Sequence, residues 1–330
     1  MSDSFWNGRR TLITGIQGFI GAWLARALVE RGARVIGYDR ADRGALDLHP
    51  GLREQVSLTL GELTDQQTLE SVLRAESVET AYHLAAQSNI SIAKGSPVAA
   101  FDTNIRGSWT FLDACRANGS LETIVVASSN TVYGEHDRAP FTEDFALNAN
   151  NPYAASKACT DILARCYAAS FGLPVAIVRA TNTYGGADPN INRIVPGTML
   201  KLLAGEAPEI RSDGSPRKGY LYVKDTVSAY LLTGERAADD DVRGRGFNFH
   251  PDQPTSVLEL VEAIVRVSGR ADLAPRVLGA AGTYEYEFLS SVRAQSVLGW
   301  RQAYPLEAGL SETYEWYRAA RDEKAVATGA

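Results

Sequence analysis

The chain has 330 residues, of which 45% are apolar and 22% are charged, as is typical of globular proteins. A net charge of −6 argues against a general nucleic-acid binder, and no apolar run reaches the roughly 18 residues that a membrane span needs. Neither the cysteines nor the histidines have metal-ligand spacing, and residues 1–10 do not resemble a secretion signal. We therefore expect a cytoplasmic protein with reduced cysteines and without a metal site, a nucleic-acid partner or a membrane span.

In chain order, six short β-rich runs alternate with helical patterns between residues 10 and 179. This alternation is typical of crossover units and predicts a parallel sheet with helices on both faces. The expected strands are Arg10–Thr14, Arg34–Tyr38, Val56–Leu60, Thr80–Leu84, Thr123–Ala127 and Val175–Arg179.

Turn-forming residues at 185–190 mark a change in the pattern. Helical periodicity follows at Ile194–Leu203, Val257–Ser268 and Leu306–Arg318. The chain also exceeds the roughly 250–300 residues at which single cores stop growing. We predict an α/β fold, with a Rossmann-type doubly wound parallel sheet in residues 1–183. Residues 184–330 would form a smaller C-terminal α/β lobe, with some segments that return to the first domain.

The segment Gly15-Ile-Gln-Gly18-Phe-Ile-Gly21 joins the first predicted strand to a helix predicted at Phe19–Glu30. Glycine permits the tight turn at Gly15, the close approach of backbone to a pyrophosphate at Gly18, and the packing of helix against strand at Gly21. The helix start offers N–H groups and a positive dipole end to the anion. We predict a dinucleotide site with loop contacts at Gly15, Gln17, Gly18, Phe19, Ile20 and Gly21.

Asp39 ends the second β-rich segment, 18 residues after Gly21, where a carboxylate can accept hydrogen bonds from both ribose hydroxyls. The same charge would repel a 2′-phosphate, which favours NAD over NADP. Arg40 leaves NADP open, because a guanidinium beside Asp39 could hold that phosphate. Residues 1–183 are therefore predicted to bind NAD.

Ser129, Tyr153 and Lys157 form a candidate catalytic set. An N-cap residue and a proline at 151–152 predict a helix start, so that Tyr153 and Lys157 lie one turn apart. The ammonium favours the phenolate, which makes Tyr153 the candidate base. Lys157 would also hold the nicotinamide ribose, and Ser129, after a strand, would donate a hydrogen bond to the reacting oxygen. Together with the glycine loop, these residues predict a redox enzyme.

Eight segments along nearly the whole chain carry a family resemblance. They are TGIQGFIG at 14–21, HLAAQS at 83–88, NIRG at 104–107, SSNTVYG at 128–134, NPYAASK at 151–157, NTYGG at 182–186, GYLYVKD at 219–225 and VLGW at 297–300. These motifs resemble the extended short-chain dehydrogenase/reductase family, in its branch of nucleotide-sugar epimerases and dehydratases. Within that branch they look most like the group of CDP-glucose 4,6-dehydratases.

The resemblance implies further contacts. For NAD it implies Glu62 and Leu63 at the adenine, Leu84, Ala85 and Ala86 along the cofactor, and Asn104 near the nicotinamide. For a nucleotide-sugar substrate it implies Ser88, Asn130, Thr131, Asn182, Arg193, Arg217 and Lys218, so that residues 184–330 would mainly bind substrate. The chain departs from the family at Glu62, where aspartate is usual, and at Lys218-Gly219, where arginine and aspartate are usual. Arg217 could compensate for the missing guanidinium.

Asn130 and Thr131 bear on the reaction. Relatives that eliminate water look to carry an acid or a lysine at these positions, whereas Asn130 and Thr131 do not titrate near neutrality. A 4-epimerase needs neither group, so we predict a 4-epimerase. A 4,6-dehydratase is the alternative if Glu135, His136 or Lys94 supplies the missing base. Alternatives of other classes are an NADPH-dependent carbonyl reductase and a non-catalytic dinucleotide sensor.

Helices predicted at Ser96–Asn118 and Pro152–Phe171 carry apolar positions on more than one face. One of these faces is therefore available to a second copy of the chain. In the family that the chain resembles, the two corresponding helices form a dimeric four-helix bundle. The resemblance therefore implies a homodimer.

Overall fold

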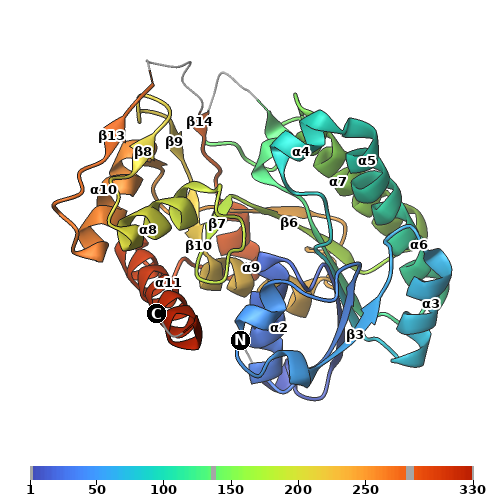
Figure 1. Ribbon diagram of the computed structural model, residues 1–330. Helices are drawn as coiled ribbons and strands as arrows, with labels where there is room; N and C mark the ends of the chain where they lie inside the picture. Colours follow the sequence, from blue (N-terminus) through green and yellow to red (C-terminus); the bar gives the residue numbers. More distant parts are fainter. Residues whose placement is uncertain (1–2, 135–138, 280–285, 329–330) are drawn as a thin grey trace. The chain divides into compact units, whose positions relative to one another are not determined.

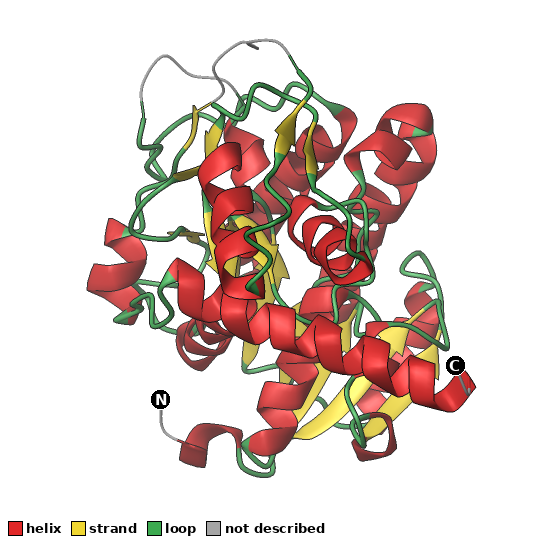
Figure 2. Ribbon diagram, turned by 60° about the vertical axis from the view of Figure 1, so that its left-hand side comes forward, coloured by secondary structure: helices red, strands yellow, loops and turns green. Residues whose placement is uncertain are grey.

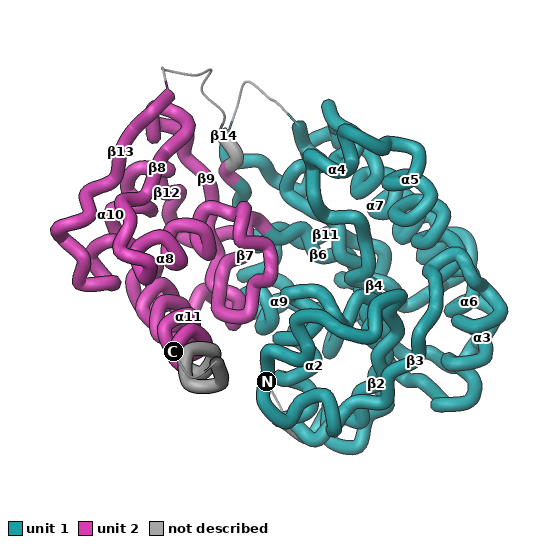
Figure 3. The backbone as a smooth tube through the Cα atoms, in the orientation of Figure 1, with its two compact units in different colours: residues 1–180, 226–249, 289–300 teal, residues 181–225, 250–288, 301–330 magenta. Residues whose placement is uncertain are grey.

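The computed structural model describes residues 3–134, 139–279 and 286–328. The chain forms two compact units, coloured teal and magenta in Figure 3. Unit 1 comprises residues 1–180, 226–249 and 289–300, and unit 2 comprises residues 181–225, 250–288 and 301–330. Two segments from the second half of the chain thus belong to the first unit.

Seven parallel strands form the sheet of unit 1, in the order β11-β6-β5-β4-β1-β2-β3. They are β1 Arg10–Thr14, β2 Arg34–Asp39, β3 Val56–Leu60, β4 Thr80–His83, β5 Thr123–Ala127, β6 Val175–Ala180 and β11 Gly246–Phe249. Six of them agree with the predicted runs to within one residue, which confirms the doubly wound parallel sheet. The sequence pattern misses β11 because this strand has only four residues and follows the charged stretch 236–245.

Helices cover both faces of this sheet (Figures 1 and 2). Leu12, Ile124 and Val126 pack in one buried cluster with residues of α3 (Gln66–Ala75), α6 (Gly107–Asn118) and α7 (Pro152–Phe171). Helix α2 (Phe19–Glu30) lies on the opposite face in Figure 1. All five residues of β5 are buried, as expected for a strand that is covered on both sides.

Several short helices complete unit 1. They are α1 Asp3–Trp6, η1 Ala45–Leu48, η2 Arg53–Gln55, α4 Ile90–Gly95, α5 Pro97–Phe101, the π-helical turn η3 Asp102–Arg106, η4 Asn130–Tyr133 and the π-helical turn η5 Ala294–Leu298. Helix α9, Val223–Arg236, begins in unit 2 and continues into unit 1. No described helix is both long and apolar enough to cross a membrane.

The described part of unit 2 contains three longer helices, of which α10 packs against the other two. Ser256 and Glu259 form a capping box at the start of α10, which is why the sequence pattern locates this helix correctly. The strands are too short to show periodicity. The helices are α8 Ile194–Ala204, α10 Val257–Ser268 and α11 Leu306–Thr328, and the strands are β7 Asn182–Tyr184, β8 Glu209–Ile210, β9 Arg217–Lys218, β10 Tyr220–Tyr222, β12 Thr255–Ser256, β13 Arg276–Val277 and β14 Tyr286–Glu287.

Candidate active site

The glycine loop follows β1 and leads into α2. Gly15 has a φ of +76°, and a Cβ on it would lie 2.6 Å from the backbone N of Ala85. A Cβ on Gly21 would lie 2.2 Å from the carbonyl O of Gly15. No side chain caps α2 at Gly18. The loop therefore excludes side chains at two of its glycines, and it leaves the first N–H groups of α2 available to an anion.

Backbone hydrogen bonds hold Asp39 against this loop. Its Oδ2 accepts from the N–H of Gln17 at 3.0 Å, and its Oδ1 accepts from the N–H of Ala41 at 3.0 Å. Each carboxylate oxygen keeps a further lone pair for a ribose hydroxyl. Arg40, the next residue, is exposed. The loop and Asp39 thus fit the pyrophosphate and the ribose of a dinucleotide.

The other predicted cofactor residues follow neighbouring strands. The Tyr38 hydroxyl donates to the carbonyl O of Glu62 at 2.8 Å, which ties the segment after β3, with the buried Leu63, to β2. Residues 84–86 follow β4 and are half-buried. Because parallel strands end at the same edge of a sheet, these residues share the carboxyl edge with Asp39.

Lys157 joins α7 to the end of β5. The helix begins as predicted, since Asn151 caps it by accepting an N–H of the first turn. The Lys157 side chain is buried, and its Nζ donates to the carbonyl O of Ala127 at 2.8 Å. Burial lowers the pKa of Lys157 to about 8. This hydrogen bond places the ammonium at Ala127, the residue two positions before Ser129.

Ser129 is held by the two residues that follow it. Its Oγ donates to Oδ1 of Asn130 at 3.2 Å and accepts from Oγ1 of Thr131 at 3.0 Å. Tyr153, on the first turn of α7, is half-buried. The pKa of the buried Tyr230 is raised by its own burial and next by the nearby phenol of Tyr153. The Ser129 hydroxyl is therefore oriented by uncharged groups, and no carboxylate or ammonium follows it within these two residues.

Asn104 contacts helix α7. It is buried, its Oδ1 accepts from the N–H of Gln87 at 2.7 Å, and its Nδ2 donates to Oγ of Ser156 at 2.8 Å. Ser156 lies between Tyr153 and Lys157 in the sequence. The sequence patterns did not single out Ser156 or the hydroxyls around it. The available signal was the recurrence of serine and threonine at otherwise apolar positions of helices. These residues normally favour caps and turns, so their presence inside a helix indicates a special contact.

Asn182 and Lys218 lie close together in unit 2. Asn182, on β7, donates from Nδ2 to the carbonyl O of Gly219 at 3.3 Å, and Gly219 directly follows Lys218. A Cβ on Gly219 would lie only 2.3 Å from Nε2 of His250. The space that the family's usual aspartate side chain would need is therefore filled by His250.

Arg193 and Arg217 have carboxylate partners of their own. Nη1 of Arg193 lies 2.9 Å from Oδ2 of Asp188, and Nη2 of Arg217 lies 3.3 Å from Oε2 of Glu259. Ser88 belongs to unit 1 and is exposed. The structure thus brings Asn182 next to Lys218 but gives the two predicted substrate arginines separate ion pairs.

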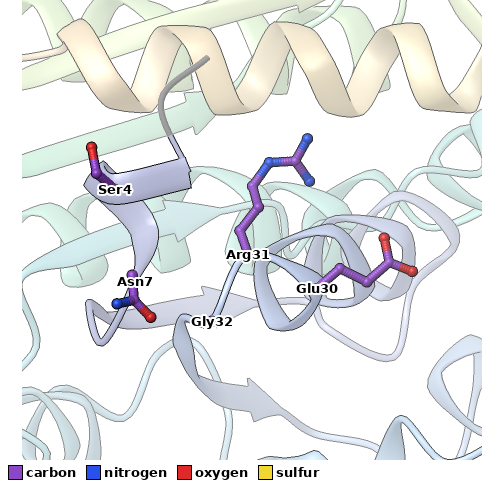
Figure 4. A pocket seen from close by; sticks show the side chains of 5 residues that line it. All are labelled: Ser4, Asn7, Glu30, Arg31 and Gly32. Carbon is purple, nitrogen blue, oxygen red and sulfur yellow. The ribbon is translucent and has the colours of Figure 1, made fainter.

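A surface hollow lies away from the glycine loop. Figure 4 shows it, lined by Ser4, Asn7, Glu30, Arg31 and Gly32. Glu30 is the last residue of α2, whereas the glycine loop lies at the first residue of that helix. The hollow is therefore not part of the candidate site. The described part of the chain also holds no group of His, Cys, Asp and Glu side chains that could bind a metal ion.

Comparison with known proteins identifies the family. Residues 12–313 match the family model of GDP-mannose 4,6 dehydratase. The chain belongs to this family. The resemblance to extended short-chain dehydrogenases/reductases is thereby confirmed.

Named relatives include several activities. The chain is 31% identical to dTDP-4-dehydro-6-deoxy-D-allose reductase of Streptomyces bikiniensis, over 96% of this chain and 99% of the relative. It is 30% identical to UDP-glucose 4-epimerase of Mycolicibacterium smegmatis, over 94% and 98%. Its fold matches dTDP-glucose 4,6-dehydratase of Bacillus anthracis in complex with NAD, with a TM-score of 0.84 and 25% identity over 95% of this chain and 98% of that one. Family membership therefore fixes the type of enzyme and leaves the reaction to be argued from the site.

Proposed function

We propose that the protein is an NAD-dependent enzyme that modifies a nucleotide sugar through transient oxidation at C4, and that it acts as a 4-epimerase. The observation that carries this proposal is the set Ser129, Tyr153 and Lys157. Ser129 is followed by Asn130 and Thr131, which do not titrate near neutrality. Bound NAD would supply a hydride acceptor that later returns the hydride to the same carbon. Relatives named as 4-epimerases and a 4,6-dehydratase support the reaction type.

The residues divide the proton chemistry among them. Tyr153 would remove the proton from the C4 hydroxyl and give it back when the carbonyl is reduced. The ammonium of Lys157 would favour the phenolate and hold the nicotinamide ribose. Ser129 would donate a hydrogen bond to the C4 oxygen, which requires its hydroxyl to turn from Asn130.

Asn130 and Thr131 favour epimerisation over dehydration. Removal of the C5 proton and loss of the C6 hydroxyl call for a base and an acid, and neither residue provides one. Of the other candidates, Lys94 is exposed on α4, while Glu135 and His136 lie outside the described residues. A 4,6-dehydratase therefore stays the second candidate, supported by the relatives of that name.

Unit 1 would bind NAD through the glycine loop, Asp39, residues 62–63 and 84–86, and Asn104. Unit 2 would bind mainly the nucleotide sugar, through Asn182 and through Lys218, which precedes the Gly219 carbonyl that Asn182 contacts. Structural relatives solved with NAD support this cofactor. The exposed Arg40 leaves NADP as the alternative, so both cofactors belong in the assay.

The dimer proposal rests on α5, α6 and α7. These helices leave large apolar side chains exposed that a second copy would cover: Val98 at 79%, Trp109 at 45%, Ile162 at 54% and Phe171 at 56% exposure. We also propose a cytoplasmic location, because all three cysteines are free. Light scattering at micromolar concentration should give the mass of a homodimer, and a monomer mass would contradict the first of these proposals.

The reaction is tested by incubating the purified protein with CDP-, UDP-, GDP- and dTDP-sugars and identifying products by NMR. We expect interconversion of C4 epimers without net consumption of cofactor. A 4-keto-6-deoxy product would favour the dehydratase. Stoichiometric consumption of added NADPH would favour a reductase, and one of the relatives is named as a reductase. No product with any of these substrates, despite bound NAD, would favour a dinucleotide sensor.

A further inference from the structure

His83, the last residue of β4, is held at both ring nitrogens. Its side chain is 1% exposed, its Nδ1 lies 2.9 Å from Oγ1 of Thr14, and its Nε2 lies 3.0 Å from Oγ of Ser108. The ring stacks on Phe111 with 4.6 Å between centroids and an interplanar angle of 12°. The imidazole therefore cannot turn without breaking a hydrogen bond.

The π-helical turn η3 explains what Ser108 does. A π-helical turn disturbs the usual i to i+4 hydrogen bonding, which frees a carbonyl for side chains. The carbonyl O of Asn104 in this turn accepts from Oγ of Ser108 and from Oγ1 of Thr160, the latter at 3.1 Å. Ser108 has one hydroxyl hydrogen, and this contact uses it.

The protonation state of His83 follows from these contacts. Because Ser108 donates its hydrogen elsewhere, its oxygen accepts from Nε2–H of His83. Nδ1 then carries the lone pair, which accepts from the hydroxyl of Thr14. Burial, and next the ammonium of Lys157, lower the pKa of His83 to about 3, in agreement with a neutral ring.

This chain of hydrogen bonds ends at two functional segments. Thr14 is the last residue of β1 and precedes Gly15 of the glycine loop. At the other end, Nδ2 of Asn104 donates to Oγ of Ser156 at 2.8 Å, and Ser156 donates to the carbonyl O of Tyr153 at 2.7 Å. One continuous path of buried polar groups therefore runs from the glycine loop to the first turns of α7.

We propose that His83 is a positioning residue, which fixes the glycine loop and the catalytic helix α7 in register through Thr14 on one side and Ser108 on the other. It donates and accepts one hydrogen bond each, and it touches neither substrate nor cofactor in this role. The proposal rests on the proposed function, because it assumes that the pair on α7 carries the chemistry.

Thr14→Val and Ser108→Ala test the two bonds with little change in volume. We expect each substitution to lower kcat about tenfold, the upper range for loss of one buried hydrogen bond, with the KM for the nucleotide sugar changed less than about twofold. The double variant should lose little more than either single variant, because one break already interrupts the path. Additive losses, or an unchanged kcat, would overturn the proposal.

Replacing the ring itself gives a rescue experiment. His83→Asn puts an amide near the position of Nδ1, and His83→Gln puts one near Nε2, so each can restore one bond. Both should retain a higher kcat than His83→Ala at equal thermal stability. If the three variants lose kcat equally, or only in proportion to their loss of Tm, the ring merely fills space and the proposal is wrong.

Thr123→Val is the matched control. It removes the buried 2.9 Å hydrogen bond between Thr123 and Thr80, the first residues of β5 and β4. This bond lies at the opposite end of β4 from His83, so its loss should lower Tm and leave kcat unchanged. NAD binding, followed by fluorescence, should stay within about threefold in all variants. Tyr153→Phe separates the two proposals. If Tyr153→Phe leaves turnover intact, the proposed function fails. If Tyr153→Phe abolishes turnover but the His83 variants keep the wild-type kcat, only the positioning role fails.

Discussion

The candidate catalytic residues of unit 1 and the predicted substrate residues of unit 2 differ in how firmly the fold places them. In unit 1, Ser129 follows the buried strand β5, and Tyr153 and Lys157 lie on the first turns of a capped helix, so regular elements fix their backbone positions. In unit 2, Asn182, Arg217 and Lys218 lie on strands of two or three residues. Arg193 directly precedes α8, and both arginines are held in ion pairs. The shared chemistry of such a chain is therefore set by regular elements, whereas its specificity depends on irregular ones.

The largest effect should come from Tyr153→Phe. Removal of the phenolic proton carrier should lower kcat by about 10²–10⁴-fold, the usual range for a general acid or base. The thermal midpoint and NAD binding should hardly change. Tyr167→Phe is the control: this tyrosine lies on the same helix, its hydroxyl lies 3.5 Å from Oδ1 of Asp113, and its loss should leave the activity unchanged. Initial rates of epimer formation measure the difference, and equal rates would refute the role of the phenol.

Gly21→Ala should damage cofactor binding next most strongly. Its Cβ would lie 2.2 Å from the carbonyl O of Gly15, so the loop must shift away from the pyrophosphate. We expect NAD affinity to fall at least about tenfold, as when several charge-assisted hydrogen bonds weaken together.

Gly119→Ala is the matched control for that substitution. Gly119 has a φ of +69° but open space around it, so the variant pays only backbone strain of about 1 kcal/mol. Calorimetric titration with NAD compares the two. Equal affinity of both variants would mean that the glycine loop is not the dinucleotide site.

Lys157 should give the activity an alkaline limit. Burial lowers its pKa to about 8 from 10.5, so the ammonium is lost as pH rises through about 8. The rate should then fall about fivefold between pH 8 and 9, because the protonated fraction drops from about one half to about one tenth. The free energy of unfolding should instead rise with pH between 8 and 10.5, because in this range the unfolded chain still binds the proton that the folded chain has lost. In Lys157→Arg the side chain stays charged above pH 8. We expect this variant to be slower than the wild type, but its rate should not decrease further between pH 8 and 9.

How far the sequence reaches can be judged from the same residues. Strands such as Thr123–Ala127 are buried on both faces and rich in β-branched residues, so their pattern is unambiguous. The glycine loop, Asp39 and the pair on α7 depend on local geometry and were found at strand and helix ends. His83, Ser108 and Thr160 were not, because their contacts join residues 25 and 52 positions apart and depend on the π-helical turn. No local pattern reveals such a turn.

The smallest effect should distinguish the cations of β9. By the family resemblance Lys218 would take the place of a diphosphate-binding arginine, so Lys218→Ala should raise the KM for the nucleotide sugar about fivefold to tenfold, as for loss of one charge-assisted contact. Arg217 donates to the carbonyl O of Pro254 at 2.9 Å and pairs with Glu259. An exposed ion pair of this kind contributes little to stability, and its guanidinium is already engaged. Arg217→Ala should therefore change KM less than about threefold. If Arg217→Ala raises KM more than Lys218→Ala, the arginine must leave Glu259 to bind substrate, and the specificity of unit 2 depends on a rearrangement.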